Sequence, residues 1–255
     1  MARRIEWIAT LAAALAAPGA WAAPACSARS AATPTPLIEL YTSEGCSSCP
    51  PADKWLSALA AQQRDAEPAP VALAFHVDYW DRLGWTDRHA SAAYTRRQAQ
   101  QQRSNGARFS YTPQVVTNGI DRPDWPGLRH APQAEGAARV AIELERSGDA
   151  VVARIAGTAN APAQLAAYWA VTEDGHATQV RAGENQGARL LHDRVVRELV
   201  EVPGWPTRGA TSPQLLRFTP QGAADPAHPR RINLVVLDAG TGRPLQALAL
   251  ACWQG

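Results

Sequence analysis

The stretch Tyr41–Trp55, YTSEGCSSCPPADKW, holds two cysteines, Cys46 and Cys49, separated by two residues and followed by two consecutive prolines. It lies between an apolar run that ends at Tyr41 and a segment whose apolar residues recur at helical spacing. A Cys-x-x-Cys motif in this position has three interpretations: half of a metal site, a structural disulfide, or a redox pair. The compartment and the flanking segments help to decide among them.

The N-terminal segment 1–25 has the features of an export signal, namely early arginines, an apolar run and small residues near its end. The apolar run is short for a membrane span of about 20 residues, and no later segment approaches that length. The sequence therefore predicts a cleaved signal peptide over 1–25 and a periplasmic or secreted bacterial protein. Because Cys26 follows this segment directly, lipid attachment to Cys26 is an alternative.

The composition narrows the classes of partner. The formal net charge is +2, and the chain has no long basic run. Nucleic acid and acidic membrane surfaces are therefore not expected partners. Arginine supplies nearly all of the basic charge and alanine is abundant, a composition typical of GC-rich bacterial genomes. In an oxidising compartment the four cysteines can form two disulfides.

The first part of the chain alternates strand and helix patterns. Apolar runs predict strands at 37–41, 71–77 and 114–117, and helices are expected over 52–60 and 90–103. The dipeptide Asn118-Gly119 is a strong hairpin signal. This order predicts a small α/β sheet, in a domain over 36–135.

The pattern changes near Arg139 to short strands with turn residues between them. Such a pattern predicts a β-rich, sandwich-like domain over 139–255. The run 190–202 fits either a strand or a helix. The segment 203–229, rich in Pro, Gly and Ala, is expected to be a long surface excursion.

The metal interpretation of the motif lacks ligands. A structural zinc site needs four ligands, but the chain has no second Cys-x-x-Cys and its six histidines are scattered. We therefore assign no metal and no cofactor. A Cu(I) ion held by the two thiolates stays open as an alternative, because soft thiolates suit that ion.

The redox interpretation follows from the flanking elements. A strand that feeds a helix through this loop places the first cysteine near the helix N-terminus, where free N–H groups and the helix dipole favour the thiolate. We therefore predict that Cys46 attacks and that Cys49 resolves the mixed disulfide. Pro50 and Pro51 are tolerated only in the first turn, so the regular helix should begin near Cys49 or Pro50. Cys46 then lies in the preceding loop and gains less from the dipole.

Four motifs carry a family resemblance: ELYTSEGCSSCPPAD (39–53), AFHVDYWDRLGWTD (74–87), YTPQVVTNG (111–119) and GENQGARLLHDRVVR (183–197). Together they resemble a family of secreted bacterial thioredoxin-like proteins known only as domain-of-unknown-function family 1223. The resemblance implies a thioredoxin-like α/β domain, which the β-rich, sandwich-like domain follows. It also implies that Cys46 and Cys49 are the redox pair, and it implies no established substrate.

Three further residues are candidates for supporting this pair. Thr112-Pro113 precedes a predicted strand at the position where thioredoxin-fold proteins place a cis-proline, so we predict a cis bond there, against the cysteine loop. Glu39, in the strand before the loop, is a candidate proton carrier for Cys49 if it is buried; alternatively it lies solvated at the rim of the sheet. Glu44 is expected to be exposed.

Two polar or aromatic segments have two interpretations each. The loop His76–Trp85 follows a strand, and its aromatic residues form either a docking platform beside the disulfide or a self-packed loop. The group Gly183-Glu184-Asn185, with His192-Asp193, forms either a polar cluster facing the cysteines or a turn followed by a salt-bridged histidine. The sequence favours the second interpretation, so this group is not assigned to the catalytic set.

The remaining cysteines, Cys26 and Cys252, lie near the two ends of the mature chain. Domain termini are often close together, so we predict a structural Cys26–Cys252 disulfide. The predicted function is an exported thiol–disulfide oxidoreductase acting on protein thiols, protein disulfides or a periplasmic redox partner. The alternative is a binding or assembly protein, or a copper carrier, in which the Cys46/Cys49 pair is a static clip or a ligand pair.

Overall fold

The structure is a computed structural model that describes residues 26–63, 66, 68–133, 135–207 and 212–253. The predicted signal peptide, 1–25, lies outside the described residues. Within the described residues, no helix is both long enough and apolar enough to cross a membrane.

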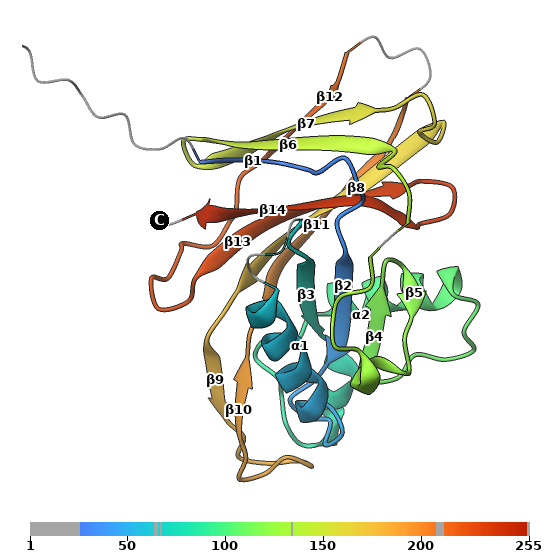
Figure 1. Ribbon diagram of the computed structural model, residues 1–255. Helices are drawn as coiled ribbons and strands as arrows, with labels where there is room; N and C mark the ends of the chain where they lie inside the picture. The colour runs from blue at the N-terminus through green and yellow to red at the C-terminus, as the bar shows by residue number, and fades with distance from the viewer. Residues whose placement is uncertain (1–25, 64–65, 67, 134, 208–211, 254–255) are drawn as a thin grey trace, which may run out of the picture.

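One eight-stranded mixed sheet runs through the molecule (Figure 1). Its spatial order is β14–β13–β8–β11–β3–β2–β4–β5. These strands are β2 (Leu37–Thr42), β3 (Val71–His76), β4 (Gln114–Thr117), β5 (Ile120–Asp121), β8 (Gln164–Glu173), β11 (Val195–Pro206), β13 (Arg230–Asp238) and β14 (Pro244–Trp253). Strands β2 and β3 are parallel, and β11 joins β3 in parallel through the pair Val195 and Ala74.

Strands β2 and β3 are buried at every position, as expected for parallel strands covered on both faces. Successive residues of β2 therefore face opposite layers. Ile38 and Leu40 pack with helix α1 (Pro50–Gln62), whereas Tyr41 stacks on Phe75 in the layer that contains helix α2 (Ala92–Ser104). The Ser91 hydroxyl caps α2 by accepting from the Ala93 N–H.

A second sheet packs over the β-rich end of the first one (Figure 1). Its order is β1 (Ser27–Arg29), β6 (Val140–Ser147), β7 (Ala150–Gly157) and β12 (Gln214–Phe218). The core between the two sheets is apolar, with Trp169 stacked on Phe218 at a centroid distance of 5.1 Å. The prediction of a β-rich fold is confirmed.

Several local expectations change. The ambiguous run 190–202 contains two strands, the second of which continues to Pro206. The segment 203–229 is not a plain excursion, because it also contains β12; β1 was not predicted. Segments 36–135 and 139–255 contribute strands to the same sheet. Their division into two domains stays a prediction. Sequence patterns detect strands, but they do not show which strands pair with one another.

A two-stranded ribbon stands apart from both sheets. Strands β9 (His176–Gln179) and β10 (Arg189–His192) pair with each other, and β10 lies against α1. The tip of this β9–β10 hairpin reaches the loop that leads into α1 (Figure 1). The ribbon thus brings residues from the second half of the chain to the cysteine motif.

Candidate functional site

Cys46 and Cys49 form a disulfide in the loop between β2 and α1, with their Cα atoms 5.4 Å apart. Two consecutive turns shape the loop: the Cys46 N–H donates to the Ser43 carbonyl, and the Cys49 N–H donates to the Cys46 carbonyl. The Cys46 Sγ lies 3.4 Å from the Ser48 Oγ. Both cysteines have zero exposed surface, although Ser48 is exposed.

Helix α1 begins at Pro50, with Cys49 as its N-cap residue. The Cys49 carbonyl accepts from the N–H groups of Ala52 and Asp53, at 2.9 Å and 3.2 Å. The two prolines occupy the first helical positions, where a missing N–H removes no helical hydrogen bond. Cys49 therefore lies at the helix N-terminus and Cys46 in the preceding loop, which matches the start expected from the proline pair.

Asp53 is a buried acid that the sequence analysis did not identify. It follows Cys49 by one helical turn, a spacing that places two side chains on the same face about 5–6 Å apart at Cβ. Its carboxylate accepts from the Thr42 hydroxyl at 3.2 Å, and only 7% of the residue is exposed. Burial raises the pKa of Asp53 above its ordinary value. The spacing from Cys49 was the available sequence signal, but an acid in a first turn is ordinarily a dipole partner.

Glu39 is fully buried, so its alternative position at a solvated rim is wrong. Its carboxylate accepts hydrogen bonds from the side chains of Arg97 (3.0 Å), Gln101 (2.6 Å) and Tyr168 (2.9 Å). Arg97 and Gln101 belong to α2, whereas Cys49 is the N-cap residue of α1 on the opposite face of the sheet. The carboxylate is thus engaged in a buried ion pair, which is a poor arrangement for carrying protons to Cys49.

Glu44 was expected to be exposed, and the structure buries it completely. Two segments fold over it: the Trp85 Nε1 donates to its Oε2 at 2.8 Å, and the His192 Nε2 lies 3.4 Å from its Oε1. The Glu44 N–H donates to the Asp87 Oδ2 at 2.9 Å. Burial by itself would raise the pKa of Glu44, but the contacts with His192 and Trp85 outweigh it, so this pKa lies below its ordinary value.

Behind Glu44 lies a buried histidine cluster made of His76, His89 and His192. The His76 ring centroid lies 5.3 Å from that of His89 and 4.9 Å from that of His192. The His76 Nδ1 is 2.6 Å from the Asp87 Oδ2. Burial opposes the charge on His76, but the Asp87 carboxylate raises its pKa above the ordinary value, and the same contact holds the pKa of Asp87 well below its own.

The third member, His89, stays neutral. Burial, together with the charge on neighbouring His76, lowers the pKa of His89 to about 2. Among the residues that the structure describes, no group of three or more His, Cys, Asp or Glu side chains is arranged to hold a metal ion. We therefore interpret the histidine cluster as a group of buried side chains that interact electrostatically with the carboxylates of Asp87 and Glu44 behind the cysteine loop.

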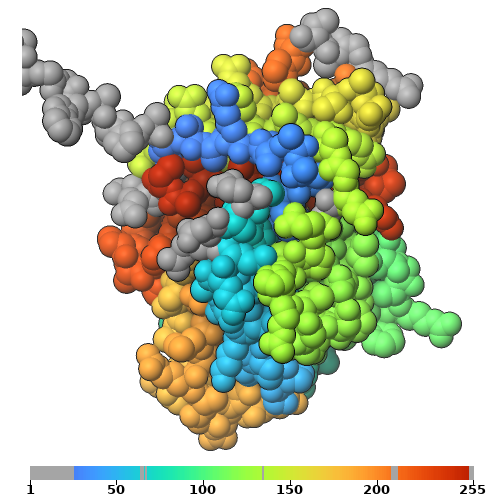
Figure 2. All heavy atoms as spheres, in the orientation of Figure 1, coloured from blue at the N-terminus to red at the C-terminus, as the bar shows by residue number. Residues whose placement is uncertain are grey.

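The tip of the β9–β10 hairpin binds the cysteine loop directly. The Asn185 amide donates to the carbonyls of Glu44 and Cys46, each at 2.9 Å. The Glu184 carboxylate accepts from the Ser47 N–H at 3.0 Å and from the Ser47 hydroxyl at 2.7 Å. In Figure 2 the hairpin surface adjoins the surface of the loop and the start of α1. The favoured interpretation, a turn followed by a strand whose histidine lies beside a carboxylate, is therefore observed, and the group also faces the cysteine loop as the alternative had it.

The aromatic loop packs on the same motif. The Trp80 Nε1 donates to the Thr112 Oγ1 at 2.8 Å, and a side chain at Gly45 would approach the Trp80 Cβ within 3.2 Å. The Thr112–Pro113 bond is cis. The next residue, Gln114, pairs with Tyr41 at the end of β2 that leads into the cysteine loop. Thr112 therefore lies at the same end of the sheet as the cysteine pair.

Cys26 and Cys252 form the second disulfide, with Cα atoms 5.7 Å apart and a sequence separation of 226 residues. Cys26 directly precedes β1, and Cys252 lies in β14. The Cys26 sulfur is therefore occupied by Cys252, which disfavours lipid attachment to it.

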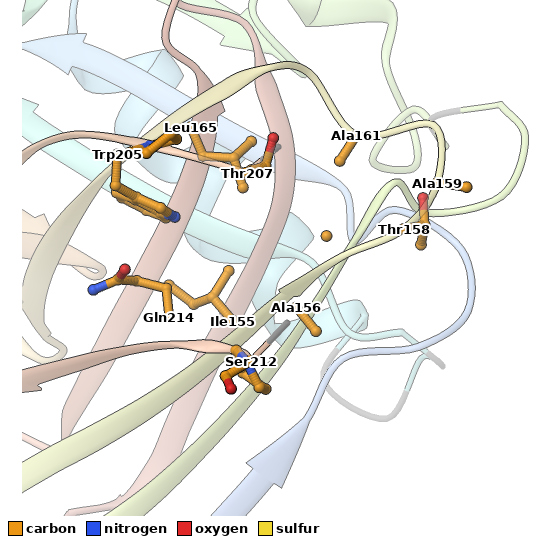
Figure 3. A pocket seen from close by; sticks show the side chains of 13 residues that line it. Ile155, Ala156, Thr158, Ala159, Ala161, Leu165, Trp205, Thr207, Ser212 and Gln214 are labelled. Atoms are coloured by element: carbon orange, nitrogen blue, oxygen red, sulfur yellow. The ribbon is translucent and has the colours of Figure 1, made fainter. Parts of the chain in front are cut away.

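A cavity of about 520 Å³ lies between strands of the β-rich end (Figure 3). Its lining includes Ile155, Leu165, Trp205 and Gln214, from β7, β8, β11 and β12. No cysteine lines it. The cavity is therefore separate from the cysteine site.

Comparison with known proteins places the chain in a family. The family model described as "Protein of unknown function (DUF1223)" matches residues 37–235, which is well over half of the chain. The chain belongs to this family, which confirms the resemblance carried by the four motifs. No curated protein matches the chain.

Two solved structures are similar to this fold. The crystal structure of protein AGR_C_4864 from Agrobacterium tumefaciens has a TM-score of 0.60 and 25% sequence identity, and the match covers 86% of this chain and 95% of that one. HBP35 of Porphyromonas gingivalis has a TM-score of 0.57 and 14% identity, over 87% of this chain and 76% of that one. The second likeness concerns the fold alone.

Proposed function

We propose that this member of the DUF1223 family is an exported thiol–disulfide oxidoreductase that uses Cys46 and Cys49 as its redox pair. One observation carries the proposal. A Cys-x-x-Cys disulfide sits at the N-terminus of α1, and a buried acid with a raised pKa, Asp53, follows one turn later. This arrangement provides a helix dipole and a proton carrier beside a pair of sulfurs.

The order of the elements supports a thioredoxin-like assignment of the segment 36–135. A strand, the cysteine loop and a helix are followed by a parallel strand, a second helix on the other face and an antiparallel strand. Thr112 and Pro113 immediately precede that last strand. The predicted signal segment supports export, and an oxidising compartment suits a chain with two disulfides.

The proposed exchange has two steps. A partner thiolate attacks the Cys46 Sγ, the Cys46–Cys49 bond breaks, and a bond forms between the partner sulfur and Cys46. Cys49 leaves as a thiolate and takes the proton of Asp53. A second thiol of the partner then gives its proton to the Asp53 carboxylate and displaces Cys46, which leaves as a thiolate and takes a proton from water, where the first partner thiol released its own. The partner dithiol thus loses two electrons and this protein gains them. The reverse sequence oxidises this protein and reduces a partner disulfide.

Cys46 is proposed as the attacked sulfur because of its surroundings. Its Sγ lies beside the Ser48 hydroxyl, whose O–H can donate to a thiolate. Cys49, in contrast, is paired by helical spacing with Asp53, which suits the sulfur that exchanges a proton. We therefore retain Cys46 as the nucleophile of the reduced protein.

The complete burial of both cysteines favours one rival, in which the disulfide is a static clip in a binding protein. Labelling with a thiol reagent across a glutathione redox titration separates the two functions. The oxidoreductase exchanges at Cys46–Cys49 under native conditions. A pair that stays oxidised throughout the titration supports the clip.

The partner is identified by trapping. In Cys49→Ala the mixed disulfide on Cys46 cannot be resolved, so partners remain attached during purification from the periplasm and are identified by mass spectrometry. The double variant Cys46→Ala/Cys49→Ala is the matched control and should capture none. Equal capture by both variants would contradict the assignment of Cys46.

A further inference from the structure

The proposed exchange requires a partner thiolate to reach the Cys46–Cys49 disulfide. Both Cys46 and Cys49 have zero exposed surface, so no thiolate reaches either sulfur in the described conformation. A disulfide reacts by direct attack on a sulfur atom along an open approach. Some part of the structure must therefore move before the reaction starts.

Two segments meet over the cysteine loop. One is the aromatic loop, where Trp80 packs against Gly45. The other is the turn 183–187 at the tip of the β9–β10 hairpin, and an added Cβ at Gly183 would lie 3.2 Å from the Trp85 Cβ. The positive φ angles of Gly183 (74°) and Gly187 (86°) shape this turn.

The turn satisfies backbone groups of the cysteine loop itself. Asn185 donates to two carbonyls, those of Glu44 and Cys46, and Glu184 accepts from the Ser47 N–H. Backbone polar groups that lose such partners need water or another donor in their place. The closed position of the turn is therefore held by side-chain hydrogen bonds to the residues that flank the reactive sulfur.

The hairpin that carries the turn is anchored at its base, where β10 packs on α1 and His192 is buried, but its tip is paired to no described strand of the main fold. Strands β9 and β10 pair only with each other in the described sheets. An isolated two-stranded hairpin is marginally stable, and each neutral hydrogen bond adds only a modest net stabilisation. The tip can thus detach without the loss of a strand pair from the eight-stranded sheet.

We propose that the turn 183–187 is a latch over the Cys46–Cys49 disulfide, and that Asn185 is the positioning residue that holds it closed. A thiol-bearing partner reaches Cys46 when the Asn185 hydrogen bonds open. This inference deepens the proposed function, on which it rests, by naming what regulates access to the same cysteine pair.

The test compares reduction of the two disulfides in one sample. Purified oxidised protein is treated with dithiothreitol under native conditions, quenched with acid and alkylated, and each cysteine pair is quantified by peptide mapping. In Asn185→Ala we expect Cys46–Cys49 to be reduced roughly tenfold faster, the factor expected when about one net hydrogen bond is lost. Asn185→Asp, which keeps the size but lacks the donor, should behave alike.

The chain offers a matched control outside the hairpin. The exposed Gln221 amide also donates to a backbone carbonyl, that of Thr219, and takes no part in the turn 183–187. Gln221→Ala should leave the reduction rate of Cys46–Cys49 near that of the wild type. Cys26–Cys252 is an internal reference, and its reduction should be unchanged in every variant, because a purely destabilising substitution would accelerate both disulfides.

The possible results distinguish failure of the latch proposal from failure of the proposed oxidoreductase function. If wild-type Cys46–Cys49 exchanges with glutathione and Asn185→Ala exchanges at the same rate, the latch is overturned and the oxidoreductase stands. If Asn185→Ala opens a pair that never exchanges in the wild type, the latch stands and the proposed function is overturned. The latch is also overturned if Asn185→Ala accelerates both disulfides together, or if Gln221→Ala accelerates Cys46–Cys49 as much as Asn185→Ala does.

Discussion

Cys26–Cys252 spans 226 residues and joins the start of the chain to β14, whereas Cys46–Cys49 spans three residues and lies under a hairpin tip. In the loop-entropy model the first link stabilises the fold by roughly 5 kcal/mol as an upper figure, and the second by roughly 2 kcal/mol. Cys26–Cys252 lies among strand ends, whereas Cys46–Cys49 lies near Asp53, Glu44 and the histidine cluster. The comparison indicates that the first disulfide contributes more to stability, whereas the second is the one to which the proposed function assigns chemistry.

The largest effect expected from this comparison is on stability. Cys26→Ser/Cys252→Ser should lower the free energy of unfolding by up to roughly 5 kcal/mol, and Cys46→Ser/Cys49→Ser by no more than roughly 2 kcal/mol. Denaturant unfolding monitored by tryptophan fluorescence measures both. A larger loss from the Cys46/Cys49 variant would reverse the assignment of roles.

The second effect is on reaction rate. Asp53→Asn removes the proton carrier proposed for Cys49, so reduction of Cys46–Cys49 by dithiothreitol should slow on the order of 100-fold. Asp149→Asn, on the exposed β6–β7 turn, is the control and should react like the wild type. If Asp53→Asn is reduced at the wild-type rate, Asp53 is not the proton carrier for Cys49.

The third effect is on the stability of the fold at low pH. It arises at the Cys46–Cys49 end, where the buried histidines lie. The pKa of His89 is lowered to about 2, while the unfolded chain takes up this proton near pH 6.5. His89 therefore makes stability fall as pH drops below 6.5, by up to about 1.4 kcal/mol per pH unit. His76, with its raised pKa, contributes stability that is complete below pH 6.5 and is lost as the pH rises through its folded-state pKa, so its slope lies above pH 6.5.

Substitution isolates the contribution of His89. His89→Gln should have a smaller loss of stability between pH 6.5 and about 4 than the wild type, measured by denaturant unfolding at each pH. A steeper loss in the variant would mean that His89 is charged in the folded protein.

The smallest effect is on the titration of the thiol. Glu184→Gln removes a negative charge beside Ser47 while keeping an acceptor, so the Cys46 thiol of Cys49→Ala should titrate a fraction of a pH unit lower. Alkylation rates against pH measure this, and the difference should vanish in 1 M salt because Glu184 is exposed. Glu143→Gln, at the far end, is the control. A shift that persists in high salt would point to a change in loop geometry.

Local patterns were predictable and long-range proximity was not. The strand 114–117 was predicted with the bounds observed, because a β-branched apolar run and the turn residues after it are encoded locally. The burial of Glu44 was missed because it depends on Trp85 and His192, which reach it from distant segments. Asp53 was detectable by its helical spacing from Cys49, whereas the partners of Glu39 required knowledge of which face α2 covers.

The place of β11 in the eight-stranded sheet has a consequence for the order of folding. Strand β3 pairs with β2 on one side and with β11 on the other, and the Ala74 N–H donates to the Arg194 carbonyl. During synthesis or translocation from the N-terminus, β3 is an open edge until residues near 195 arrive. The segment that carries Cys46 and Cys49 therefore completes its sheet late. On the latch proposal, its two cysteines are uncovered in this interval, before the hairpin closes over them.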